Sequence, residues 1–199
     1  MMATIYDLKP KFQALLRPIV NRFAQKGYTP NQITWVALIL SVVTGGLIAM
    51  TSGARWTLIL IPFVLFIRMA LNAIDGMLAK EHHMKSDGGA MLNEMSDVVS
   101  DVALYLPFAL ISGIPAIWVV LFVITSVFTE MAGVLGWAIK HDRRYDGPMG
   151  KSDRAFVMGL IALLLALGIP TGSWLTILFI VITLLSGWTS LRRILKALG

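Results

Sequence analysis

Residues 72–101 read NAIDGMLAKEHHMKSDGGAMLNEMSDVVSD, a polar and glycine-punctuated stretch inside an otherwise apolar chain. Hydrophobic residues make up 57% of the 199 residues, charged residues only 14%, and the mean hydropathy is +0.76. A soluble domain of this length carries about a quarter charged residues. The composition therefore predicts an all-α integral membrane protein with one domain, residues 1–199. Carboxylates inside such a chain are costly and usually functional.

Apolar runs on both sides of this stretch predict a bundle of six membrane-spanning helices over residues 33–196, because each run is near the ~20 residues that cross a bilayer. The expected spans are 33–51, 56–79, 91–112, 116–139, 155–169 and 174–191. Residues 4–26 place apolar side chains at helical spacing, with Lys9, Lys11, Arg17 and Arg22 largely away from them. This pattern predicts an amphipathic helix that lies on the membrane surface.

The distribution of basic residues predicts the topology. Of the 17 Lys and Arg residues, only Arg55 and Arg68 fall outside the segments expected on one side of the membrane. The positive-inside rule places that side, with both termini and the polar stretch, in the cytoplasm, and we expect a bacterial inner membrane. The net charge of +6 is then explained by anionic lipid headgroups, and no nucleic-acid partner is needed. With no cysteine, the sequence excludes a thiolate metal site and a cysteine nucleophile.

Helical spacing arranges the polar residues on two ladders. Asn72, Asp75 and Ala79 share one face of the helix that enters the cytoplasm. The next helix carries, at four-residue steps, Gly89, Asn93, Asp97 and Asp101. Oxygen ligands of this kind suit a hard divalent cation such as Mg²⁺, Mn²⁺ or Ca²⁺. The structural alternative is a set of polar contacts that holds neighbouring helices together.

The same stretch resembles the signature of the CDP-alcohol phosphotransferase family, D-x2-D-G-x2-A-R-x8-G-x3-D-x3-D. The pattern in this chain reads Asn72-x2-Asp75-Gly76-x2-Ala79-Lys80-x8-Gly89-x3-Asn93-x3-Asp97. Its spacing matches at every position, although asparagine replaces the first and third aspartates and lysine replaces the arginine. Residues 28–34 also resemble the segment that opens the family's first membrane helix, and Gly150-Lys151 resembles a Gly-Lys element before the fifth.

The resemblance implies an enzyme that transfers a phosphatidyl group from CDP-diacylglycerol to an alcohol or phospho-alcohol acceptor and releases CMP. It further implies dependence on one or two Mg²⁺ or Mn²⁺ ions, a homodimer, Asp97 as general base and Asp75 as the other surviving carboxylate. The implied cation ligands are Asn72, Asp75, Asn93 and Asp97, with Asp101 added if the metal centre lies one turn deeper. The implied nucleotide contacts are Asn31, Thr34, Gly76, Ala79, Lys80 and Gly89.

Three basic residues, Arg68, Lys151 and Arg154, are candidates for binding the acceptor. Arg68 is expected at the depth of Asp101 and Glu130, so we expect one or both carboxylates to neutralise it. In the resemblance, Lys151 and Arg154 can bind a phosphate on the acceptor. Glycerol phosphate, inositol phosphate, serine and an unusual sugar or polyol are all compatible acceptors.

Two other functions stay open. A catalytically weakened or inactive homologue that binds lipid or nucleotide would explain the two missing aspartates. A small transporter would explain intramembrane charges as a permeation site. The position of the polar stretch at the cytoplasmic helix ends and the spacing of the signature disfavour the transporter.

Overall fold

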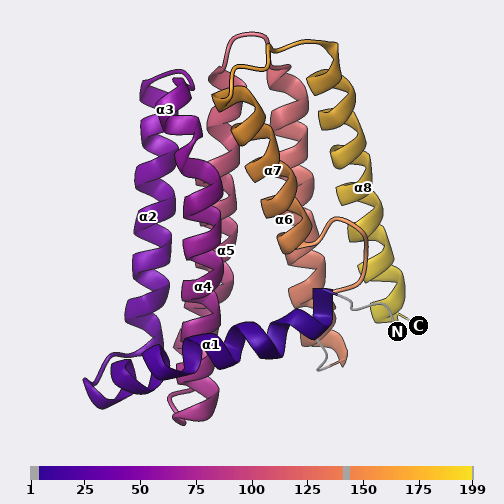
Figure 1. Cartoon of the computed structure of the whole chain (residues 1–199). Helices are drawn as coiled ribbons and strands as arrows, with labels where there is room; N and C mark the ends of the chain where they lie inside the picture. Colours follow the sequence, from indigo (N-terminus) through magenta and orange to yellow (C-terminus); the bar gives the residue numbers. More distant parts are fainter. Residues whose placement is uncertain (1–4, 141–143, 199) are drawn as a thin grey trace. The chain divides into compact units, whose positions relative to one another are not determined.

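The computed structural model describes residues 5–140 and 144–198, and the chain there is a succession of helices (Figure 1). In chain order the elements are α1 (Ile5–Gln25), α2 (Pro30–Met50), α3 (Arg55–Leu58), α4 (Leu60–Glu81), α5 (Asp87–Tyr105), the 3-10 helix η1 (Leu106–Leu110), α6 (Ala116–Lys140), α7 (Lys151–Ala166) and α8 (Ser173–Leu198). These elements form two compact units. The first unit comprises Met1–Ser41 and Val64–Ser100, and the second comprises Val42–Phe63 and Asp101–Gly199.

Four helical segments are long and apolar enough to cross a membrane. They are Pro30–Met50, Arg55–Glu81, Ala116–Ile139 and Ser173–Leu198. The remaining two predicted spans correspond to α5, which carries Asp97 and Asp101, and to α7, which has 16 residues and is therefore about 24 Å long. The all-helical architecture is as predicted, whereas the count of six spans stays a prediction.

Two prolines shift predicted helix boundaries. The predicted span 56–79 is interrupted at Ile59, between α3 and α4. Pro62 explains this break, since its ring clashes with the carbonyl group four residues earlier. The predicted span 91–112 ends as an α-helix at Tyr105 and continues as η1, with Pro107 in the first positions of that 3-10 helix.

In the first unit, α1 packs against α2 and α4. Leu16 and Val20 of α1 share a buried apolar cluster with Ile33 of α2 and with Ile74 and Leu78 of α4. In Figure 1, α1 runs across the ends of α2 and α4 rather than along them. The helix predicted over 4–26 is present from Ile5 to Gln25, while residue 4 lies outside the described residues. Its position on the membrane surface stays a prediction.

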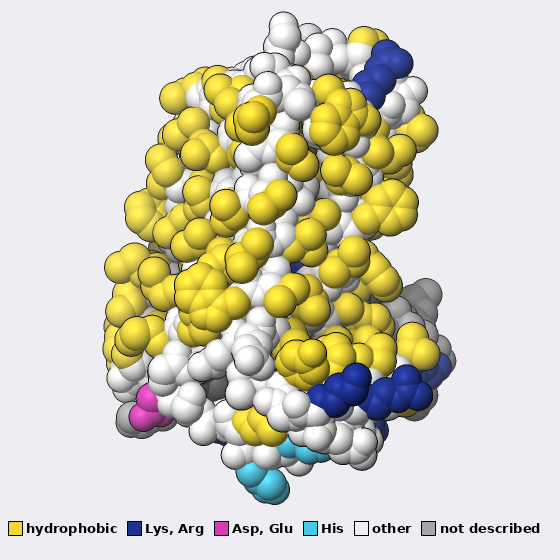
Figure 2. All heavy atoms as spheres, turned by 90° about the vertical axis from the view of Figure 1, so that its left-hand side faces the viewer, with side chains coloured by type: hydrophobic (Ala, Val, Ile, Leu, Met, Phe, Trp, Pro, Cys, Tyr) yellow, Lys and Arg dark blue, Asp and Glu magenta, His cyan; other side chains and the backbone are white. Residues whose placement is uncertain are grey.

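Exposed apolar side chains continue along α2. They include Trp35, Val36, Ile39, Val42 and Val43, all between 47 and 56% exposed. The face of the molecule in Figure 2 is covered mostly by hydrophobic side chains. An apolar exterior of this kind fits a lipid environment rather than water.

The second unit is built around contacts of α6 with α8 and with η1. A row of buried rings at its centre joins Tyr105 to Phe122 and Phe122 to Phe179, with centroid distances of 6.0 and 6.1 Å. Gly45 of α2 allows a close approach to α5, because a Cβ atom there would lie 1.9 Å from the carbonyl oxygen of Ala103. Only glycine fits at this contact.

Candidate functional site

The first unit brings Asp97 of α5 against α4. The amide of Asn72 donates a hydrogen bond from Nδ2 to Asp97 Oδ1 at 3.0 Å. Arg68 donates to the backbone oxygen of Asp97 at 3.0 Å and lies 3.4 Å from its Oδ1. Arg68 and Asp97 are only 3 and 8% exposed. Two donors from α4 therefore fix the position of this carboxylate.

Asp75 of α4 is held by a side chain of α2. The hydroxyl of Thr34 lies 2.9 Å from Asp75 Oδ2, and both side chains are buried. Because a carboxylate only accepts hydrogen bonds, the threonine is the donor. Thr34 was expected from the resemblance to contact a nucleotide, and the structure shows that it also orients Asp75.

A second contact between predicted site residues joins the start of α2 to the start of α5. A Cβ atom on Gly89 would lie 2.8 Å from Asn31 Oδ1 and 2.9 Å from Ser86 Oγ, so a larger residue would displace Asn31. A Cβ atom on Gly76 would meet nothing within 4 Å, so there is space beside the backbone of α4. A glycine at this position allows a ligand to approach the main chain closely.

The remaining predicted residues of this unit lie on the expected faces. Asn93 is half-buried on α5, four residues before Asp97, and therefore on the same face. Ala79 is half-buried and Lys80 is exposed at the end of α4. We call the set of Thr34, Asn72, Asp75, Asn93 and Asp97 the polar site.

The donor chemistry of the polar site fits a single divalent cation better than two. Its oxygen atoms come from two carboxylates and two amides, and hard cations such as Mg²⁺ and Mn²⁺ prefer such ligands. Among the described residues, no group of three His, Cys, Asp or Glu side chains lies close enough to hold a metal. Amide oxygens and substrate phosphates would have to complete the coordination.

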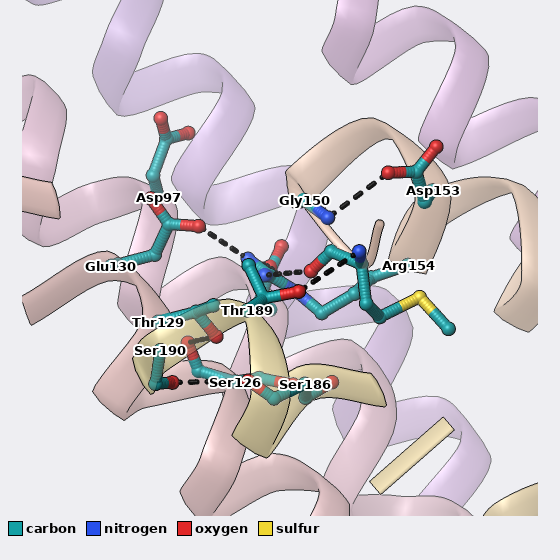
Figure 3. Close-up of polar contacts among 12 residues, drawn as sticks. Asp97, Ser126, Thr129, Glu130, Gly150, Asp153, Arg154, Ser186, Thr189 and Ser190 are labelled. Carbon is teal, nitrogen blue, oxygen red and sulfur yellow. Dashed lines mark hydrogen bonds and ion pairs between the residues drawn. The ribbon is translucent and has the colours of Figure 1, made fainter. Parts of the chain in front are cut away.

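The second unit contains a separate set of four charged side chains, which we call the buried charge cluster: Asp101, Glu130, Arg154 and Arg193. All four are at most 6% exposed. Arg154 Nη2 lies 3.0 Å from Asp101 Oδ2. The same nitrogen lies 2.7 Å from Glu130 Oε1 (Figure 3). Arg193 Nη1 lies 3.8 Å from the same oxygen of Glu130. Buried charges are stable only when paired in this way.

Backbone contacts position the arginines of the cluster. Arg154 donates to the carbonyl oxygen of Met149, while Arg193 donates to those of Thr129 and Asp146. The amide of Gly150 donates to Asp153 Oδ2 at 3.0 Å and so caps the start of α7 (Figure 3). The predicted Gly150-Lys151 element is thus the first turn of a helix that carries Arg154.

The pairing of Arg154 was missed from the sequence. The structure places Arg154 on both Asp101 and Glu130, and it places Arg68 within 3.4 Å of Asp97. The neutralisation of Arg68 by Asp101, by Glu130 or by both stays a prediction. The sequence interpretation began the fifth span at residue 155, so Arg154 was treated as a loop residue. Gly150 followed three residues later by Asp153 was the signal of an earlier helix start. A role of Arg68, Lys151 or Arg154 toward the acceptor stays a prediction.

The loop before α7 is fixed to the end of α8. Lys196 forms an ion pair with Asp146, and Arg144 donates to the backbone oxygen of Lys196 at 2.6 Å. The ammonium of Lys196 holds the pKa of the Asp146 carboxyl below its ordinary value. Gly147 has φ +111°, and a Cβ atom there would overlap Thr189 at 2.4 Å.

Comparison with known proteins places this arrangement in a family. The sequence profile of the CDP-alcohol phosphatidyltransferase family matches residues 27–188. The chain is 44% identical to Inner membrane protein YnbA of Escherichia coli (strain K12) over 190 residues, which cover 96% of this chain and 94% of YnbA. An uncharacterized protein of Aquifex aeolicus (strain VF5) is 35% identical over 102 residues, or 51% of this chain and 47% of that protein.

Solved structures show the same fold. The phosphatidylinositol phosphate synthase PgsA1 of Mycobacterium tuberculosis with CDP-DAG bound has a TM-score of 0.76 at 18% identity, covering 90% of this chain and 92% of PgsA1. The same enzyme in complex with manganese and citrate also gives 0.76 at 18% identity, covering 92 and 88% of the two chains. The four apolar helices and the similarity to an inner membrane protein establish a membrane protein. The chain belongs to the CDP-alcohol phosphatidyltransferase family.

Proposed function

We propose that this protein transfers a phosphatidyl group from CDP-diacylglycerol to an alcohol acceptor and releases CMP. The observation that supports this most is the pair of buried carboxylates, Asp75 and Asp97, each held by a side chain from another helix. Both lie in the part of the chain that matches the family profile. A protein of the same fold with CDP-DAG bound supports the choice of donor lipid.

In the proposed reaction, the acceptor oxygen attacks the β-phosphorus of the CDP-lipid. A new P–O bond forms, the bond to the CMP oxygen breaks, and CMP leaves with the electron pair. Asp97 accepts the hydroxyl proton as general base, and its carboxylate is oriented by Asn72 and Arg68. Bound Mg²⁺ or Mn²⁺ would stabilise negative charge on the transferring phosphoryl group.

The nucleotide half of the donor would lie along the start of α2 and the end of α4. The close contact of Asn31 with Gly89 and the space beside Gly76 support this position. Lys80 would meet a phosphate as a point charge, because an ammonium lacks the planar fork of an arginine. Ala79 is small enough to leave room on the same helix face.

We further propose that α5 and α7 complete six spans and that α1 lies in the membrane interface. Both termini and the polar site then face the cytoplasm of a bacterial inner membrane, as the distribution of Lys and Arg predicts. Because the chain has no cysteine, single cysteines introduced at Ser173 and at Gln25 would report opposite sides by labelling with an impermeant reagent. Labelling of both from the same side would refute this topology. A homodimer is proposed from family analogy.

A second candidate function is binding without catalysis. It is favoured by asparagine at positions 72 and 93, which leaves two fewer carboxylates in the polar site than the family signature expects. Such a protein would still bind CDP-diacylglycerol through Asn31, Gly76 and Gly89. It would release no CMP with any acceptor.

The two candidates are separated by measuring CMP release from CDP-diacylglycerol by the purified protein, with Mg²⁺ or Mn²⁺ and a panel of alcohols. Lipid mass spectrometry after overexpression identifies the product, with Asp75→Ala as the inactive control. Transfer predicts CMP release that Asp97→Asn abolishes. Saturable binding of CDP-diacylglycerol without CMP release would refute transfer and support the binding function.

A further inference from the structure

A pocket of about 280 Å³ opens in the second unit, where three connections between helices meet. The connections join α2 to α3, η1 to α6 and α7 to α8, and they contribute Gly53, Ile111 and Thr171 to the pocket walls. Leu58 of α3 and Leu165 of α7 add apolar surface. This volume lies just below the range of about 300–1,000 Å³ that holds drug-sized molecules, so the pocket suits a small group.

The pocket walls are held by close contacts between these connections. A Cβ atom on Gly53 would lie 2.5 Å from Ile111 Cγ1, and a Cβ atom on Gly113 would overlap the hydroxyl of Thr171. Each connection therefore packs directly against its neighbour. The pocket is a built feature of the second unit and not a gap between loosely placed loops.

Arg55, the first residue of α3, lines the pocket with its guanidinium against the end of α7. A Cβ atom on Gly168 would lie 3.3 Å from Arg55 Nη2 and 3.4 Å from its Cζ. The last carbonyl groups of a helix attract a cation, which favours this position of the guanidinium. The contact is to the main chain of a glycine and engages no side-chain acceptor.

The donors of Arg55 are available to a ligand. A guanidinium carries five N–H groups, and within residues 5–140 and 144–198 the Arg55 side chain makes no hydrogen bond or ion pair. The three connections, residues 51–54, 111–115 and 167–172, contain no aspartate or glutamate. The pocket thus presents one uncompensated positive charge among apolar walls, which is an environment that favours an anion.

Two tryptophans mark the depth of the pocket in the membrane. Trp56 follows Arg55 and is 57% exposed, and Trp174 donates from Nε1 to the carbonyl oxygen of Pro170, which lines the pocket, at 3.0 Å. Tryptophan is enriched where headgroups meet the hydrocarbon core. Phospholipid phosphates are the abundant anions at that depth. Ile169, also on the pocket wall and 42% exposed, offers apolar surface to an acyl chain.

We propose that this pocket binds the phosphate of an anionic phospholipid, with the guanidinium of Arg55 as its ligand. An arginine binds a phosphate through two parallel N–H···O bonds. No carboxylate lines the pocket, so the ammonium of a zwitterionic headgroup finds no partner there, whereas an anionic headgroup needs none. None of the lining residues belongs to the polar site, and the proposal does not depend on the transfer reaction.

The first test counts bound lipid by native mass spectrometry of the purified protein in a nonionic detergent. The probes are dihexanoyl phosphatidylglycerol, dihexanoyl phosphatidylcholine and inorganic phosphate. We expect the wild type to bind one copy of phosphatidylglycerol that Arg55→Gln binds about tenfold more weakly, because charge-assisted hydrogen bonds are lost. At this site the wild type should prefer phosphatidylglycerol over phosphatidylcholine about fivefold. Arg192→Gln is the matched control, because it removes another exposed arginine that does not line the pocket.

The alternatives give different results. Equal binding by the wild type and Arg55→Gln, or an equal loss in Arg192→Gln, would overturn the site. Binding of inorganic phosphate as tightly as the lipid, and with the same dependence on Arg55, would overturn the assignment to a lipid. Equal affinity for the two lipids would overturn the preference for an anionic headgroup.

A second measurement needs only the wild-type protein, so it decides the proposal even if Arg55→Gln does not fold. Phenylglyoxal modifies accessible arginines, and peptide mass spectrometry follows Arg55 and Arg192 separately. Phosphatidylglycerol should slow the modification of Arg55 relative to that of Arg192 by about fivefold compared with phosphatidylcholine. The same relative rate in both lipids would refute binding at Arg55. Neither measurement uses CDP-diacylglycerol, so a failure of the proposed transfer reaction would leave both results intact.

Discussion

Replacement of Glu130 by glutamine should strongly destabilise the folded protein. The substitution preserves the volume of the side chain and removes one negative charge between Arg154 and Arg193. The interaction lost is large, because at an effective dielectric constant near 20 two charges about 4 Å apart interact by about 4 kcal/mol. Glu130 lies closer than this to both guanidinium groups, at 2.7 and 3.8 Å.

Burial decides how much of this energy appears as stability. Removing one member of a buried ion pair leaves an uncompensated charge and costs about 3–5 kcal/mol. We therefore expect Glu130→Gln to lower the free energy of unfolding by about that amount. Titration with a denaturing detergent in mixed micelles, followed by circular dichroism, measures the change.

The chain supplies its own control. Arg17 and Glu81 form a two-pronged ion pair of similar geometry, at 3.0 and 3.1 Å, but their side chains are 50 and 35% exposed. Glu81→Gln should have little measurable effect, since exposed pairs are screened by solvent. The two variants differ in burial and not in chemistry.

A double-mutant cycle completes the test. Arg154→Met should be destabilising alone, because it removes the guanidinium that pairs with both Asp101 and Glu130. Arg154→Met combined with Glu130→Gln removes one positive and one negative charge, so its cost should fall below the sum of the single costs by about 1–3 kcal/mol. A loss below about 1 kcal/mol for Glu130→Gln, or strictly additive costs, would refute the argument from paired buried charges.

Three further outcomes are expected. Asp97→Asn should lower CMP release by about 100-fold or more in the folded protein, because a general base contributes about that factor. Removal of divalent cations with a chelator should abolish CMP release, and addition of Mn²⁺ or Mg²⁺ should restore it. The Asn72→Asp variant should reach half-maximal activity at a lower cation concentration than the wild type. Lys196 lowers the pKa of Asp146 in the folded protein, so this pair should stabilise the fold above the ordinary aspartate pKa. That stabilisation should be lost as the pH falls through the lowered pKa of Asp146 in the folded state. The unfolding midpoints of Asp146→Asn and of the wild type should therefore converge in acid.

The positions of the helices were predictable because apolar runs and helical periodicity dominate this sequence. The breaks inside them were harder to predict, since Pro62 and Pro107 each occur within an apolar run. A helix accommodates a proline in such a run either by continuing as a short 3-10 segment or by breaking for one residue, and the tertiary contacts decide which occurs. This is why the span predicted to begin at residue 56 is divided at Ile59.

The polar site was predictable from spacing alone in one respect. Three- and four-residue steps correctly placed Asn72 on the face of α4 that meets Asp97. The partner of Asp75 required the fold, because no periodicity links Thr34 to a residue 41 positions away. The same holds for the buried charge cluster, whose members are contributed by α5, α6, α7 and α8.

Asparagine at position 72 changes how the polar site is held together. An aspartate there would face Asp97 as a like charge and would need a cation between the two. The asparagine amide instead donates to Asp97 Oδ1, and Arg68 approaches the same oxygen at 3.4 Å. The donors Asn72 and Arg68 thus partly stabilise the negative charge of Asp97, as a cation would between two carboxylates. A divalent ion must compete with these donors for Asp97, so the polar site should bind its cation more weakly than a site with aspartate at position 72, and the phosphates of the donor lipid become correspondingly more important as ligands.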